Sequence, residues 1–364
     1  MVKMRHYKVK GKKVCVGIDV SKRKYSVHVR SEGMMVDQLT IPADYEVLLH
    51  YLRNNYPDCE IMVMYEAGFS GFGLHDSLTG EGISCIVTPP TSVTVEKVDK
   101  KQCDKHDAAR LCRNLENGDY KECEIPDKER REDRLISRTL EQVQNDITRV
   151  KNRIRKFFDC NDLNGKNTSE TWYASDWLAA RKVGKREGPL GESLGVHIST
   201  MDALLEQRRQ LRKRLVELSR KARYKKAVEL LSSISGVGMH SAIRMVLEWG
   251  EDWSRFANAA KIASYSGLIS SEYSTGDDQH RGHITGQSRG AIRAILIQCA
   301  WTAIRHDPAL KEKYRRVWKN SGSTKKAIVA VARKMVIRMR AIMLSGQKYQ
   351  VGLIEERKEK MAKR

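Results

Sequence analysis

The sequence lacks the features that mark membrane-spanning, secreted and zinc-binding proteins. It contains no apolar run of the roughly 18 residues needed to span a bilayer. Its basic first residues are not followed by the apolar core of a signal peptide. The 8 cysteines form no CxxC pair and have no His-x3-5-His partner nearby, which excludes the common zinc patterns. We therefore expect a cytoplasmic protein with no membrane partner.

Acidic residues are scarce relative to basic ones. The chain has 45 Asp and Glu against 67 Lys and Arg, so its formal net charge is +22. A positive field of this size requires an anionic partner, and nucleic acid is the leading candidate. A chain of 364 residues is too long to fold around one small hydrophobic core. The length therefore predicts two domains and a connector.

The first third of the chain has the pattern of an α/β domain. Four apolar or alternating runs predict strands, at residues 14–18, 25–29, 61–65 and 83–87. Asp44 is placed to cap a helix, and a further helix is expected from Asp107 to Leu115. These elements predict a central sheet with helices on its faces.

A heptad pattern follows and predicts a long helix in a coiled coil. Its apolar positions, spaced alternately four and three residues apart, are Ile136, Leu140, Val143, Ile147, Val150, Ile154 and Phe157. After a glycine-containing hinge or loop region, a second long helix carries many cations, among them Arg212 and Arg214. It lies antiparallel to the first or crosses between subunits. Its cations suit a phosphate backbone, although a solvated helix face has the same composition.

From about residue 227 the pattern is helical to the end. The turn that contains Gly236 and Gly238 separates two apolar segments. Its glycines allow close approach of the backbone, and exposed N–H groups at the start of the second helix suit a phosphate. Simple packing of two helices would explain the same turn.

Four carboxylates are placed where a metal site can form. Asp19 ends the apolar strand in VGIDVS, Glu66 ends the strand in MVMYEAG, and Asp104 and Asp107 begin a helix in CDKHDAA. Acids at neighbouring strand ends converge at the edge of an α/β sheet. Four such groups repel one another without a cation, and Mg²⁺ or Mn²⁺ prefers oxygen ligands. Strand-end acids and a helix cap are the structural alternative.

A polar, glycine-rich segment near the C-terminal end is expected to be a functional loop. It contains the candidate nucleophiles Ser270, Ser271 and Ser274, with Arg281 and Arg289 near enough to balance phosphate charge. The residues alone allow these serines to be hydrogen-bonding loop residues instead.

Six segments in order resemble one known family. They read GIDVSKRKYSVHV, MYEAG, CDKHDAARL, SSISGVGMHSA, RFANAAKIASYSGLISSEYSTG and RGHIT. Together they are similar to the DEDD transposases of insertion-sequence family 110, which include the Piv-type DNA invertases. The likeness covers roughly residues 14–120 and 227–305. It departs after RGHIT, where Gly286-Gln287-Ser288-Arg289 replaces the Lys-x-Gly-Asn usual in relatives.

The resemblance implies specific roles for these residues. The tetrad of a RuvC-like (ribonuclease H-type) domain would be Asp19, Glu66, Asp104 and Asp107, and the serine that attacks DNA would be Ser274. Family members also bind a structured noncoding bridge RNA that base-pairs with donor and target DNA.

We therefore predict an α/β plus α protein, with four parts along the chain. They are a RuvC-like metal-binding domain (1–125), a coiled-coil connector (126–226), a helical transposase domain with the serine loop (227–345) and a basic tail (346–364). The expected function is site-specific recombination of double-stranded DNA through a serine-phosphodiester intermediate. The alternative is a RuvC-like endonuclease that uses metal-activated water. Strand exchange needs several active sites, so a homo-oligomer is expected, a dimer or a tetramer in the synaptic complex, with the heptad seam as its contact.

Overall fold

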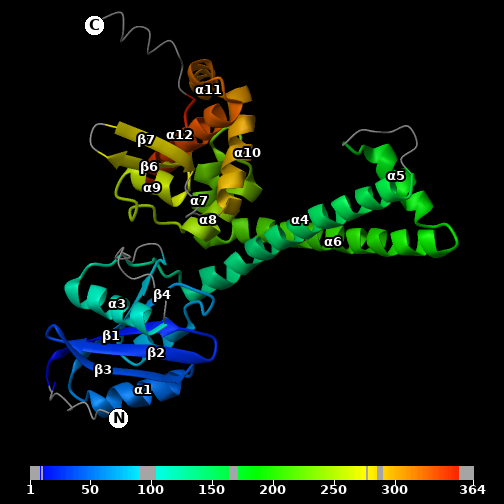
Figure 1. Ribbon diagram of the computed structural model, residues 1–364. Coiled ribbons are helices and arrows are strands. Elements are labelled where there is room, and N and C mark those ends of the chain that lie inside the picture. Colours follow the sequence, from blue (N-terminus) through cyan, green and yellow to red (C-terminus); the bar gives the residue numbers. More distant parts are fainter. Residues whose placement is uncertain are drawn as a thin grey trace, which may run out of the picture. The chain divides into compact units, whose positions relative to one another are not determined.

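The computed structural model describes most of the chain and divides it into two compact units. The described residues are 9, 11–90, 104–163, 171–275, 278–284 and 290–351, without the side chains of 104–105 and 271–281. Unit 1 comprises residues 1–125 and unit 2 residues 126–364 (Figure 1). No helix in the described part is long and apolar enough to cross a membrane.

Unit 1 is built on a five-stranded mixed sheet. Its strands are β1 (Lys13–Val20), β2 (Lys24–Ser31), β3 (Met34–Pro42), β4 (Glu60–Glu66) and β5 (Ser84–Thr88), in the order β3-β2-β1-β4-β5. The first three strands pair antiparallel, whereas β1 and β4, and β4 and β5, pair parallel. The sequence predicts four of these strands and misses β3. That strand lies at the sheet edge and has no fully buried residue, so it lacks an apolar signature.

Helices cover both faces of this sheet. They are α1 (Tyr45–Asn55), α2 (Gly73–Gly80) and α3 (Asp104–Asn117). Asp44 caps α1 as predicted, because its side chain accepts a hydrogen bond from the Glu46 backbone N–H at 2.7 Å. Figure 1 shows α1 and α3 on opposite faces of the sheet. The larger core contains Leu48 of α1, and the smaller one contains Leu111 of α3. The predicted mixed α/β architecture is thus confirmed.

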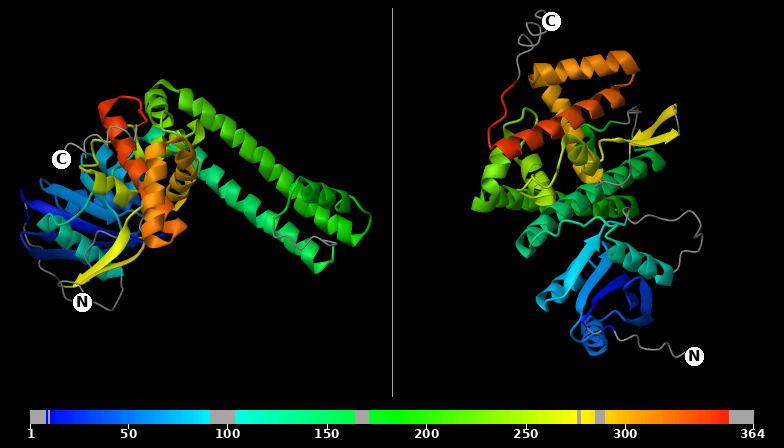
Figure 2. Two further views of the ribbon diagram at one scale, coloured as in Figure 1. Left: turned by 90° about the horizontal axis from the view of Figure 1, so that it is seen from above. Right: turned by 90° about the vertical axis from the view of Figure 1, so that its left-hand side faces the viewer.

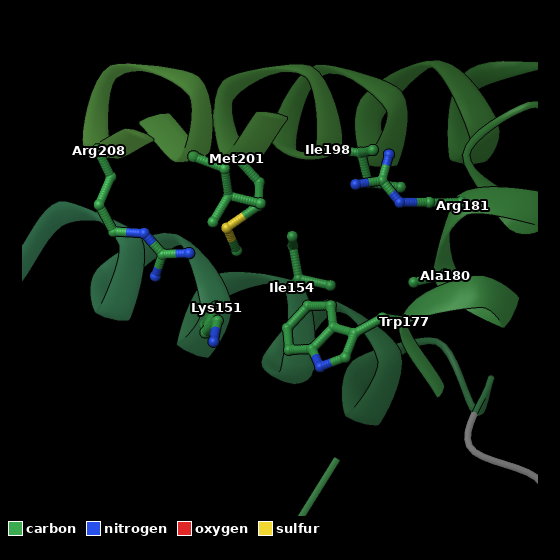
Figure 3. A pocket seen from close by; sticks show the side chains of 9 residues that line it. Lys151, Ile154, Trp177, Ala180, Arg181, Ile198, Met201 and Arg208 are labelled. Atoms are coloured by element: carbon green, nitrogen blue, oxygen red, sulfur yellow. The ribbon is translucent and has the colours of Figure 1, made fainter. Parts of the chain in front are cut away.

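A long helical hairpin forms the first part of unit 2. Its helices are α4 (Lys128–Cys160), α5 (Ala174–Val183) and α6 (Pro189–Arg220). Figures 1 and 2 show α4 and α6 side by side and antiparallel. A cavity of about 210 Å³ lies between the three helices, with Ile154, Trp177 and Met201 around it. Figure 3 shows Arg208 and Arg181 on opposite sides of this cavity.

The heptad seam of α4 is buried within the chain. Val143, Ile147 and Val150 are 7%, 4% and 5% exposed, and they share one core with Leu194 and Met201 of α6. The seam was expected to be the contact of a homo-oligomer, and that expectation is wrong. A period of seven predicts that a stripe is buried, but an intrachain helix provides the same apolar surface as a second subunit.

Replacing Ile147 and Val150 together by Asp is expected to destabilise unit 2 itself. Two carboxylates would lie in an apolar seam without partners, at a cost of about 3 kcal/mol or more. Thermal unfolding followed by circular dichroism would show a lower midpoint. Arg149→Ala is the matched control, since Arg149 lies between them with a side chain 76% exposed. An unchanged midpoint in the double variant would contradict the intrachain seam.

Ion pairs attach the base of the hairpin to the helices that follow. Arg223 contacts Asp127 and, at 2.6 Å, Glu251, while Lys221 Nζ lies 3.0 Å from the Asp133 carboxylate. The Arg223 guanidinium holds the pKa of the Asp127 carboxyl well below its usual range. These contacts join the start of α4 to the start of α7, so the hairpin and the following helices pack as parts of one unit.

The remainder of unit 2 is mainly helical. Its elements are α7 (Ala222–Ser232), α8 (Met239–Trp249), α9 (Ala259–Tyr265), β6 (Ser270–Thr275), β7 (Asp278–Ile284), α10 (Gly290–His306), α11 (Pro308–Ser321) and α12 (Thr324–Ser345). One core joins the helices, with Met335 of α12 and Leu296 of α10 fully buried. Trp249 and Trp253 pack edge to face in the same core, at 5.2 Å between ring centroids. The helix-rich C-terminal region is therefore confirmed.

Candidate active site

Asp19 and Glu66 are brought to the same edge of the sheet in unit 1. Strands β1 and β4 are parallel neighbours, and Ile18 pairs with Tyr65 immediately before the two acids. Because registered partners share a face and side chains alternate along a strand, Asp19 and Glu66 lie on one face. Both are half-buried. The sequence prediction that these two acids lie at neighbouring strand ends agrees with this register.

Helix α3 brings Asp107 against the same face. It crosses β1 at Gly17, where a Cβ atom would lie 2.2 Å from the Ala108 carbonyl oxygen and 2.4 Å from the Cys112 nitrogen. Only a residue without a side chain permits this approach. The Cys112 thiol also donates to the Cys15 carbonyl at 3.0 Å. The residue before Ala108 is Asp107, so this contact fixes Asp107 near the ends of β1 and β4.

The charges of the three acids act on one another. Burial raises the pKa of Glu66, and the negative charges of Asp107 and Asp19 raise it further, while Arg110 opposes them. Arg110 lies 2.9 Å from an Asp107 oxygen and 3.7 Å from a Glu66 oxygen. Arg110 therefore neutralises part of the negative charge that these acids gather.

The donor set fits a divalent metal ion in its chemistry. Carboxylate oxygens from two strand ends and one helix are the ligands that Mg²⁺ and Mn²⁺ prefer. Asp104 is the first residue of α3, and its side chain lies outside the described part. Among the side chains that are described, no three acids, histidines or cysteines lie close enough together to hold a metal. Arg110 instead contacts Glu66 and Asp107.

The candidate serine lies in a β-hairpin, where the sequence predicts a loop. Backbone pairing joins β6 to β7, with Ser274 opposite Gln279 and Thr275 opposite Asp278. Sequence reasoning missed the hairpin because its residues are polar, so no apolar period reveals it. The Tyr and Thr residues of β6 favour a strand and were the available signal. The side chain of Ser274 lies outside the described part.

The predicted nucleic-acid contacts have different environments. A Cβ on Gly236 would lie 2.4 Å from the Cys299 carbonyl oxygen. The backbone at Gly236 therefore packs closely against α10, which agrees with the alternative that this turn serves helix packing. Gly238 is exposed, with open space beside it, and it is the N-cap of α8.

The predicted arginine contacts differ in what the structure describes. Arg212 and Arg214 are exposed on α6, and Arg214 pairs with Glu217 at 2.9 Å. Arg289 and the side chain of Arg281 lie outside the described residues.

Sequence reasoning missed two residues that shape the acidic site, Gly17 and Arg110. Arg110 lies three residues after Asp107 on the same helix, and this spacing was a usable signal for an ion pair. Gly17 lies two residues before Asp19 in a strand, where a glycine often marks close approach of another backbone.

Comparisons with known proteins agree on one family. A model of DEDD-type IS110 transposases, described as "Transposase", matches residues 16–160. A second model, described as "Transposase IS116/IS110/IS902 family", matches residues 228–315. The first covers the strands and helix that carry the acids, and the second covers the hairpin that carries Ser274.

Individual relatives support the same assignment. "Putative transposase y4qE" of Sinorhizobium fredii is 24% identical over 340 residues, which are 92% of this chain and 83% of that protein. A second protein of that organism with the same description, y4rJ, is 27% identical over 76% of this chain and 75% of its own length. The transposase for insertion sequence element IS1533 of Leptospira borgpetersenii is 25% identical over 65% of this chain and 70% of that protein.

A DEDD-type domain implies a divalent metal site, and a transposase acts on DNA. The chain belongs to the IS110 family and is a DNA transposase, the recombination enzyme of a mobile element.

Proposed function

We propose that this transposase is a site-specific recombinase that cuts and rejoins double-stranded DNA through a covalent bond to Ser274. The observation that carries the proposal is the convergence of Asp19, Glu66 and Asp107 on one face of the RuvC-like unit, at the ends of parallel strands and beside α3. The match of both halves of the chain to transposase models supports a joint role for the acids and the serine.

In this mechanism the Ser274 hydroxyl attacks a DNA phosphorus atom and loses its proton. A serine-phosphate bond forms, the bond from phosphorus to one DNA oxygen breaks, and that oxygen leaves as a hydroxyl. A hydroxyl of the exchanging strand then attacks the phosphoserine, which rejoins DNA and releases the serine.

The acids supply the electrostatic part of the reaction. Asp19, Glu66, Asp104 and Asp107 would hold Mg²⁺, or Mn²⁺, which when bound stabilises the negative charge that develops on the phosphoryl oxygens. The negative charge of these carboxylates disfavours binding of phosphate until the ion is bound, since both are anionic. The half-buried positions of Asp19, Glu66 and Asp107 reduce screening by water and strengthen both effects.

We also propose two macromolecular partners besides DNA. A structured bridge RNA would select the donor and target sequences, and the net charge of +22 provides the attraction for such a polyanion. A homo-oligomer would supply the several active sites that strand exchange requires. Sequencing the RNA that co-purifies with the protein tests the first partner, and light scattering in the presence of DNA tests the second.

Denaturing electrophoresis of a reaction on labelled DNA tests the chemistry. The recombinase is expected to leave protein covalently attached to DNA when the rejoining step is blocked by a nicked substrate. A metal-dependent endonuclease that uses water would give free 5′-phosphate ends and no adduct. Efficient cutting without any adduct would replace the proposal by this second function.

A further inference from the structure

Arg110 of α3 is a cation that contacts two acids of the site. Arg110 reaches Asp107 at 2.9 Å and Glu66 at 3.7 Å, so its guanidinium joins an acid of α3 to an acid of β4. Its side chain is 26% exposed, and those of Glu66 and Asp107 are 32% and 33% exposed. The three groups interact where screening by water is reduced.

The hydrogen-bonding capacity of Arg110 is only partly used. Its Nε atom is buried and has no hydrogen-bond partner among the described residues, although a guanidinium has five N–H donors. Arg110 therefore has donor capacity that its two carboxylate contacts leave unused.

A divalent ion and Arg110 compete for the space between the same carboxylates. Both are cations, so they repel each other at contact distance, and both need the oxygens of Glu66 and Asp107. This competition is expected to act first at Glu66, because the Arg110–Glu66 contact is the longer of the two.

We propose that Arg110 is a positioning residue that serves as the exchangeable counter-ion of the acidic site. In the metal-free protein it neutralises Glu66 and Asp107 and keeps them together. Binding of a divalent ion displaces its guanidinium from Glu66 and leaves it attached to Asp107. This inference rests on the metal site of the proposed function, and it predicts that Arg110 weakens metal binding while it stabilises the empty site.

Titration of Mn²⁺ into the full-length protein without nucleic acid tests this exchange. Calorimetry is expected to show Mn²⁺ binding several-fold tighter in Arg110→Gln than in the wild type, because the competing cation is gone. Arg110→Lys, which retains the charge, is expected to restore the wild-type affinity in large part. Thermal unfolding in EDTA is expected to occur at a lower temperature in Arg110→Gln, because its acids then repel one another without compensation.

Arg53→Gln is the matched control. It removes one arginine and its ion pair, here with Glu81, from α1 of the same unit. Its Mn²⁺ affinity is expected to equal that of the wild type. A purely structural arginine would give weaker or unchanged binding when removed, so a gain in affinity distinguishes the exchange from support of the fold.

The outcomes separate the two proposals. Unchanged or weaker Mn²⁺ binding by a folded Arg110→Gln protein would overturn the role of Arg110 and leave the metal site in place. No Mn²⁺ binding by the wild type and by Arg110→Gln would remove the metal site, and with it both proposals.

Discussion

Ser274→Ala is expected to abolish the covalent protein-DNA adduct and to reduce cleavage by several orders of magnitude. The substitution removes the only atom that the proposed mechanism joins to phosphorus. Ser271→Ala and Thr275→Ala are the matched controls, since they remove hydroxyls from the same strand β6. Each is expected to lose at most about tenfold to a hundredfold, the loss that accompanies a supporting hydrogen bond.

Mass spectrometry of protein trapped on a nicked DNA substrate provides the measurement. The phosphodiester adduct is expected on the peptide that contains Ser274, and within it on Ser274. An adduct on Ser271 or Thr275 would assign the nucleophile to that residue of β6 and not to Ser274. An active Ser274→Ala variant that still forms the adduct would exclude this serine.

Asp19→Asn or Glu66→Gln is expected to abolish recombination while DNA binding is retained. Each change removes one negative charge from the group that holds the metal, and the loss of a single stabilising group at developing charge costs about a hundredfold to a thousandfold. Cleavage at saturating Mg²⁺ and DNA binding by gel shift, measured on the same preparations, separate catalysis from binding. EDTA is expected to have the same effect on the wild type.

Asp119→Asn is the control for this experiment. Asp119 is exposed and follows the C-terminal end of α3, whereas Asp107 lies near its start. The fold is expected to survive Asp19→Asn, because the change relieves repulsion with Glu66. Full recombination by Asp19→Asn, or by the wild type in EDTA, would contradict the metal mechanism.

Local patterns in the sequence predicted the elements whose burial repeats regularly. The apolar runs of β1 and β4 and the heptads of α4 reveal strands and a helix because one face of each must be buried. The edge strand β3 and the polar hairpin of β6 and β7 bury little, so no periodicity marks them. The seam of α4 shows the limit of this approach: Ile147 was correctly expected to be buried, but no pattern states which helix covers it.

The candidate site could likewise be predicted only in part from the sequence. Asp19 and Glu66 could be predicted to meet because strand ends in an α/β sheet share an edge. Arg110 could not be assigned to Glu66, because that contact depends on how α3 lies across β1. The packing of a helix on a sheet joins residues about 90 positions apart in the chain, and Gly17 beside Ala108 is such a pair.

The contact at Gly17 also limits how the acidic site can move. Helix and strand meet there backbone to backbone, so no side chain can change rotamer to let α3 slide or roll on β1. The separation of the Cα atoms of Asp19 and Asp107 is therefore expected to change little. Any rearrangement among the carboxylates and Arg110 has to arise from side-chain rotation, which takes picoseconds to nanoseconds in accessible residues. Rearrangement of these side chains is therefore not expected to limit the rate of the reaction.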